Sequence, residues 1–166
     1  MTPNETILHA VQRFMAGHVD ANEQDGYCLG FVTSILQAAF TLPIAEFYAK
    51  FVKLRADPVA HWESDGPWAR DAEKSLRALG MAVHDPQPGD LLFIWRDAKS
   101  DEWSREAGHD VYIGHVGILI APGLLIENVN PSYRPHSFSR GQIQLTPTAY
   151  WFAPSTVIRF DPSKGA

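Results

Sequence analysis

The chain has 166 residues, 45% of them hydrophobic and 20% charged, a balance typical of one globular domain with its own core. With 14 basic and 19 acidic residues the formal net charge is −5, and the sequence contains no basic run. Binding to nucleic acid or to an anionic membrane surface depends on a basic patch, so the composition argues against both partners. We expect a single domain spanning residues 1–166.

The cysteine count limits the covalent and metal sites of the chain, and the N-terminal sequence indicates where the protein is made. The one cysteine, Cys28, excludes an intramolecular disulfide and a multi-cysteine metal site. The opening sequence MTPNETILHAVQRFMAG lacks the basic start and apolar block of a secretory signal, and no apolar stretch is long enough to span a bilayer. The sequence therefore predicts synthesis in the cytoplasm without a signal peptide and no membrane insertion. Action outside the cell would require another route of delivery.

The first half of the chain has the apolar periodicity of helices. Thr2 and Glu5 form a capping-box pattern, and Pro3 suits the first helical position. A second apolar stripe begins at Tyr27 and is broken by the sequence TLP at 41–43. The spacing predicts four helices, at residues 3–16, 27–40, about 44–55 and about 67–80.

The second half reads as strands. Short β-rich runs separated by turn residues occur at 91–95, 112–120, 124–129 and 155–160. Helices followed by strands predict an α+β domain, with N-terminal helices packed on a small antiparallel sheet. The highly charged stretch 96–110 is expected to be an exposed loop. It is either a solvated connection without a role or a lid beside the strand that follows it.

Cys28 has two interpretations. A free cysteine is often a small buried hydrophobe of the core. Cys28, however, opens a predicted helix just after Gly26, where the helix dipole favours a thiolate and free backbone N–H groups can bind an oxyanion. This position predicts a nucleophile.

The histidines divide by their surroundings. Five lie in polar or loop segments and are expected to be solvated, and a sixth belongs to the charged stretch: His9, His18, His61, His84, His136 and His109. His115 differs because it stands within the apolar run YIGHVGILI. An imidazole in such a strand either makes a core hydrogen bond or is positioned for chemistry.

A catalytic imidazole also needs an acceptor that orients it. Glu127 lies in the next strand among apolar neighbours, and a carboxylate in that setting is unfavourable unless it is paired. The short turn APG between the two strands is expected to bring Glu127 beside His115. Alternatively, Glu127 ends its strand and meets water, with Asn128 or Asn130 as the orienting residue.

Four blocks of the sequence occur in a familiar order. They are YCLGFV at 27–32, LP at 42–43, PGDLLFI at 88–94 and GHVGILI at 114–120 followed by Glu127. Together they resemble the NlpC-type cell-wall cysteine peptidases, a papain-like superfamily whose relatives include the CHAP amidases. Tyr27 stands where this family often has aspartate, and Leu29 replaces its common serine. Glutamate as the third catalytic residue, the position that Glu127 would take, is more typical of the CHAP branch.

The resemblance implies a papain-like fold and a set of roles. Cys28 would be the nucleophile, His115 the general base and acid, and Glu127 the residue that orients the imidazole. No metal or organic cofactor is implied. Aromatic and polar residues near the site are expected to contact substrate, with core packing as the alternative for the aromatic ones: Tyr27, Trp95, Trp103, Asn128, Tyr133 and Trp151.

The implied activity is hydrolysis of an amide bond in peptidoglycan, by an endopeptidase or an amidase acting on the stem peptide. Without a signal peptide, such an enzyme would reach the wall as a phage lysin, a tail-associated muralytic protein or an injected toxin, so a phage tail or a secretion system is a possible partner. Two other classes stay open. One is a non-catalytic structural or binding module with this fold, and the other is an acyltransferase or deamidase acting on protein.

Overall fold

The computed structural model describes residues 1–22, 27–54, 69–97, 111–128, 139–140, 142–150 and 155–165. Within them, four α-helices precede every strand: α1 (Pro3–Met15), α2 (Cys28–Phe40), α3 (Ile44–Phe51) and α5 (Ala69–Ala78). The strands are β1 (Ala82–Val83), β2 (Leu91–Asp97), β3 (Val111–Ala121), β4 (Leu124–Asn128), β5 (Ser139–Arg140), β6 (Ile143–Pro147) and β7 (Ser155–Ile158). They form one antiparallel sheet in the order β1-β7-β2-β3-β4-β6-β5. The predicted α+β class is confirmed.

The start of α1 follows a local sequence signal, whereas α2 begins without a side-chain cap. Thr2 caps α1 as predicted: its hydroxyl accepts a hydrogen bond from the Glu5 N–H, and the Glu5 carboxylate accepts one from the Thr2 N–H. The second helix begins at Cys28 and ends at Phe40, and it is capped by Thr41, which adopts the left-handed conformation (φ 50°). Thus the cysteine occupies the first helical position.

The two later helices end a few residues before the ends that the sequence predicts. The predicted helix 44–55 ends at Phe51, and 52–54 continue without helical structure. The predicted helix 67–80 is described from Ala69 to Ala78, while 67–68 lie outside the described residues. Within the described residues, no helix alone is long and apolar enough to cross a membrane. The α2 and α3 pair passes that test jointly, with a bend of 102° between them.

The sheet extends beyond the predicted strands. The expectation that 96–110 is all loop is wrong at its start, because Arg96 and Asp97 continue β2 and pair with Tyr112 and Val111 of β3. Backbone pairing sustains the strand after the apolar run has ended. The rest of that stretch, 98–110, lies outside the described residues. The predicted strand 155–160 ends earlier, at Ile158.

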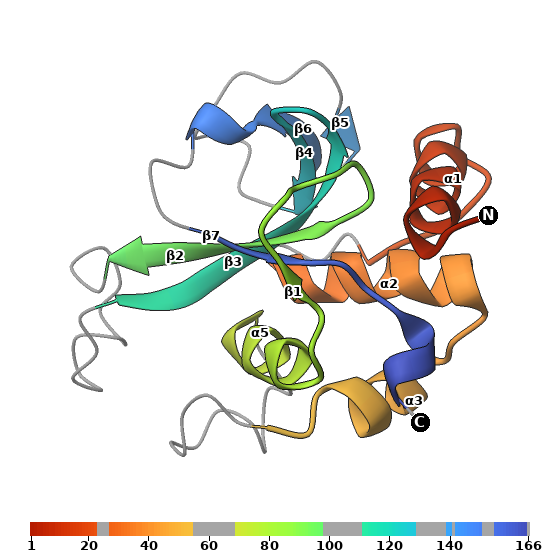
Figure 1. The fold of residues 1–166 in the computed structure, drawn as a ribbon. Coiled ribbons are helices and arrows are strands. Elements are labelled where there is room, and N and C mark those ends of the chain that lie inside the picture. Colours follow the sequence, from red (N-terminus) through yellow and green to blue (C-terminus); the bar gives the residue numbers. More distant parts are fainter. Residues whose placement is uncertain are drawn as a thin grey trace.

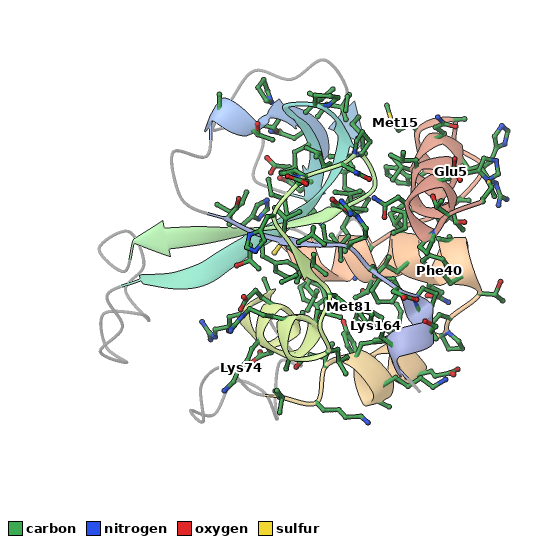
Figure 2. The ribbon with its side chains drawn as sticks, viewed as in Figure 1. Glu5, Met15, Phe40, Lys74, Met81 and Lys164 are labelled. Atoms are coloured by element: carbon green, nitrogen blue, oxygen red, sulfur yellow. The ribbon has the colours of Figure 1, made fainter. Side chains whose placement is uncertain are left out.

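The helices and the sheet enclose one main apolar layer. Figure 1 shows α2 running beneath the sheet, with α5 and α3 on the same side and α1 beside the end of α2. Figure 2 shows side chains, Met81 among them, filling the space between sheet and helices. The helix α2 is thereby packed against β3 and β4, since both strands contact it.

The PGD turn before β2 is a structural tie. The Arg159 guanidinium binds the buried Asp90 carboxylate with two nitrogens, at 3.0 and 2.9 Å, and Asn4 Nδ2 donates to the same carboxylate at 2.8 Å. Gly89 has φ 95°, and its backbone lies so close to Asn4 that a Cβ would not fit. These contacts fix the entry of β2 against α1 and the end of β7.

Candidate functional site

Three elements bring together the residues that the sequence singles out. Cys28 is the first residue of α2 and is partly exposed. His115 lies in β3 with 5% of its surface exposed, and Glu127 lies in β4 with none exposed. A partly exposed cysteine therefore stands in front of a buried imidazole and carboxylate.

The buried pair is directly bonded. His115 Nε2 lies 2.9 Å from Glu127 Oε2, so the expectation that the turn between their strands brings these side chains together is confirmed. The Cys28 thiol hydrogen-bonds to the same imidazole. Because Glu127 engages Nε2, the ring nitrogen left for the sulfur is Nδ1. The order of contacts is thus thiol, imidazole, carboxylate.

The local environment favours charge on both the sulfur and the imidazole. Burial by itself would raise the pKa of the Cys28 thiol, but the hydrogen bond and charge of His115 and the N–H groups of Val116 and Leu29 lower this pKa below its ordinary value. Burial would lower the pKa of His115, but its bonds to Cys28 and Glu127 raise this pKa to about 9. The arrangement therefore favours a thiolate beside an imidazolium over a neutral thiol beside a neutral imidazole.

The strand pairing of β3 changes on both of its edges near the site. The described pairing of β3 with β4 includes Ile118 with Ile126 but no later pair toward Glu127 and Asn128. At this level the Val116 N–H bonds to the Cys28 sulfur. On its other edge β3 carries a bulge, since Ile94 pairs with His115 but Trp95 pairs with Ile113. The site therefore lies beyond the last pair of β3 with β4, where β3 meets the amino end of α2.

Tyr27 packs over the first turn of α2. A Cβ at position 30 would overlap the Tyr27 ring, so the residue there must be glycine for the ring to lie where it does. The Tyr27 hydroxyl is 3.1 Å from the Tyr48 hydroxyl of α3. Tyr27 was predicted to contact substrate, and that role stays a prediction. The structure adds a contact that steadies the residue before Cys28.

Asn128 links β4 to the chain that leads into α2. Its Nδ2 lies 3.4 Å from the Asn22 carbonyl oxygen and 3.5 Å from the Tyr27 carbonyl oxygen. These long hydrogen bonds bracket the segment before Cys28. Glu127, rather than Asn128, is the partner of His115. The substrate contact predicted for Asn128 is not tested by this geometry.

The other candidate residues have different outcomes. His9, His18 and His84 are exposed, as the sequence predicts. Trp95 belongs to β2, but its side chain is not among those described. The remaining candidates lie outside the described residues: His61, Trp103, His109, Asn130, Tyr133, His136 and Trp151. Among the described residues, no group of three or more His, Cys, Asp or Glu side chains is arranged to hold a metal ion.

Some contributors to the site carry no sequence signal. The Val116 N–H acts through its backbone, so the identity of the side chain gives no indication of this role. Gly30 could have been noticed as a glycine on the otherwise apolar first turn of the helix. Comparison of the chain with protein-family models, with curated proteins and with solved structures finds no match in any of the three. The resemblance to cell-wall cysteine peptidases therefore rests on the four sequence blocks.

Proposed function

We propose that the protein is a papain-like cysteine hydrolase that cleaves an amide bond through Cys28, His115 and Glu127. The observation that carries the proposal is the unbroken chain of contacts from the thiol through the imidazole to a fully buried carboxylate. A core cysteine would need none of these partners. A nucleophilic thiol needs a base beside it and a third group that orients the base.

The contacts support a two-step mechanism. The Cys28 thiolate attacks the carbonyl carbon, and backbone N–H groups at the amino end of α2 stabilise the oxyanion. Protonated His115 then donates its proton to the leaving amine, so that the C–N bond breaks and a thioester remains. Neutral His115 takes a proton from water, whose oxygen attacks the thioester and releases the acid and the thiolate. Glu127 holds the ring orientation and stabilises the imidazolium.

The substrate class proposed is the stem peptide of peptidoglycan, cleaved by an endopeptidase or an amidase activity. Support comes from the sequence blocks around Cys28 and His115, which resemble NlpC-type and CHAP-type enzymes. The net charge of −5 and the absence of a basic run support a substrate other than nucleic acid. Delivery from a phage particle or through a secretion system is part of this proposal.

Purified peptidoglycan tests the proposed activity directly. Incubation with the protein is expected to release soluble fragments, and mass spectrometry of new termini identifies the cleaved bond. Release of a free stem peptide from the glycan indicates an amidase, and a cut within the peptide indicates an endopeptidase. If the wall remains intact while Cys28 is reactive, the substrate assignment is wrong and protein acyl transfer or deamidation takes its place. An unreactive Cys28 instead favours a non-catalytic module.

The pH profile is expected to have two limbs. Hydrolysis should rise with pH as Cys28 loses its proton, at a pH below the ordinary thiol value of about 8.5. It should fall again as His115 loses its proton, because the leaving amine then has no acid, and that limb should lie at about pH 9. Measuring kcat/KM on a small amide substrate from pH 4 to pH 11 checks both limbs. A single rise near the ordinary thiol value would contradict the ion pair.

A further inference from the structure

A buried amide lies across the sheet from the carboxylate of the site. Glu127 of β4 and Gln144 of β6 are direct partners in the antiparallel register, and neither side chain has any exposed surface. Partners of this kind project from the same face of the sheet, with Cβ atoms about 5 Å apart. Gln144 is thus a polar neighbour of Glu127 on the strand opposite to His115.

The hydrogen bonds of Gln144 are incomplete in one orientation of its amide. Nε2 donates to Thr146 Oγ1 at 2.9 Å, while Oε1 is buried and has no hydrogen-bond partner. A threonine hydroxyl can donate as well as accept. Turning the amide by half a rotation lets Oε1 accept from the Thr146 hydroxyl and frees the NH₂ group to donate elsewhere. A carboxylate is the natural acceptor for a buried NH₂ group.

We propose that Gln144 is a positioning residue, whose NH₂ group donates to the Glu127 carboxylate and keeps it ionised behind His115. The inference rests on the proposed function and extends the chain of contacts to Cys28, His115, Glu127 and Gln144. The titratable groups on the elements packed against β4 are Cys28 of α2 and His115 of β3, together with Tyr112 of β3, whose side chain is not among those described. The strand β6 has no titratable residue. Gln144 is thus a neutral donor from that side.

The proposal predicts the direction of a pH effect. A donor to a carboxylate lowers its pKa, so loss of the donor lets Glu127 take a proton at higher pH. Protonated Glu127 no longer stabilises the imidazolium, and the thiolate that depends on this imidazolium becomes a thiol. The low-pH limb of Cys28 reactivity should therefore move to higher pH.

Alkylation of Cys28 by iodoacetamide between pH 3 and pH 10 measures this limb without any wall substrate. Gln144→Met keeps the size of the side chain and removes the hydrogen-bond donor. It is expected to move the midpoint of the low-pH limb to higher pH by about one unit. Thr146→Val should move this midpoint by less, because the substitution removes only the hydroxyl that holds the Gln144 amide. This variant provides the test if Gln144→Met does not fold. Leu145→Ala is the matched control, since Leu145 lies on the same strand and packs in the main core. It should lower the melting temperature and leave the limb in place.

The outcomes separate the two proposals. If the low-pH limb of Cys28 alkylation stays in place in folded Gln144→Met, the role of Gln144 is overturned and the hydrolase proposal still stands. If Gln144→Met does not fold, an unmoved limb in Thr146→Val has the same meaning. An equal shift in Leu145→Ala also overturns the role of Gln144, because the effect would then come from general loosening of β6. If wild-type Cys28 alkylates like an ordinary thiol, there is no ion pair, and the proposed function fails together with the inference.

Discussion

Replacing Cys28 by alanine is expected to lower the rate of amide hydrolysis by at least ~10⁴-fold. The loss is this large because no other described side chain at the site can form the thioester, and His115 then has no nucleophile to serve. The fold should remain, with the free energy of unfolding changed by about 1 kcal/mol, since only one sulfur atom is removed, at the first residue of α2. Fragment release from peptidoglycan and a thermal melt measure the two effects.

Tyr27→Phe is the matched control for this experiment. It alters the adjacent residue by one hydroxyl, which contacts Tyr48 and does not reach the imidazole pair in the described contacts. Activity should stay within a few-fold of wild type, and a much larger loss would support the substrate contact predicted for Tyr27. Residual hydrolysis by Cys28→Ala above one-hundredth of the wild-type rate would remove Cys28 from the mechanism. So would iodoacetamide labelling of the wild type that occurs only after unfolding.

The long elements could be predicted because each carries its own local signal. The capping box at Thr2 and Glu5 places the start of α1. The apolar runs that become β2, β3 and β4 are long enough for strand periodicity to be recognised. Two-residue strands such as β1 and β5 have no periodicity at all, and they exist because a neighbouring strand offers backbone partners. No sequence pattern indicates such strands.

The strand β6 shows how burial can contradict a pattern. Its sequence IQLTP alternates apolar and polar residues, which is typical of a strand with one face in water. Gln144 and Thr146 are nevertheless fully buried, because the face they share is covered and carries the Glu127 carboxylate. From the sequence alone, a polar residue that alternates with apolar ones is predicted to face solvent. Only the identity of its partner on the neighbouring strand shows that it is buried beside another polar group.

The sequence predicts the side-chain contacts of the candidate site but not its backbone contacts. The pairing of His115 with Glu127 could be predicted, since the short sequence APG joins their two apolar runs and a buried carboxylate needs a partner. The apolar periodicity also predicts that a helix starts near Cys28, as it does in the structure. The hydrogen bond from the Val116 N–H to the sulfur could not be predicted, because a backbone donor has no side-chain signal and its partner depends on how the helix and the sheet are arranged.

Glu127→Gln is expected to lower kcat by about 10²- to 10⁴-fold without abolishing hydrolysis. Glutamine keeps an oxygen that can accept from His115 Nε2, but it lacks the charge that stabilises the imidazolium. The pKa of His115, about 9 in the native protein, should fall, so the high-pH limb of hydrolysis should move to lower pH. Glu127→Ala should be slower still, because the imidazole then loses its acceptor altogether.

The same substitution should change stability in a pH-dependent manner. Folding raises the pKa of His115 above its unfolded value of about 6.5, so the stabilisation from its charged form is fully present below about pH 6.5. It is lost as the pH rises through about 9, where the native imidazole also becomes neutral. The melting temperature of Glu127→Gln should therefore lie furthest below that of the wild type at pH 6, and the difference should shrink toward pH 10.

Asn128→Ala distinguishes the orienting role of Glu127 from general support of the site. Asn128 contacts the carbonyls of Asn22 and Tyr27, so its loss should loosen the start of α2 and lower kcat moderately. It should leave the high-pH limb in place, because it does not touch the imidazole in the described contacts. If Asn128→Ala is crippled and moves that limb while Glu127→Gln keeps the wild-type rate, the carboxylate is a structural partner of His115 and the third position of the site belongs to Asn128. If both variants move the limb equally, the pKa of His115 depends on the position of α2 rather than on the charge behind the ring.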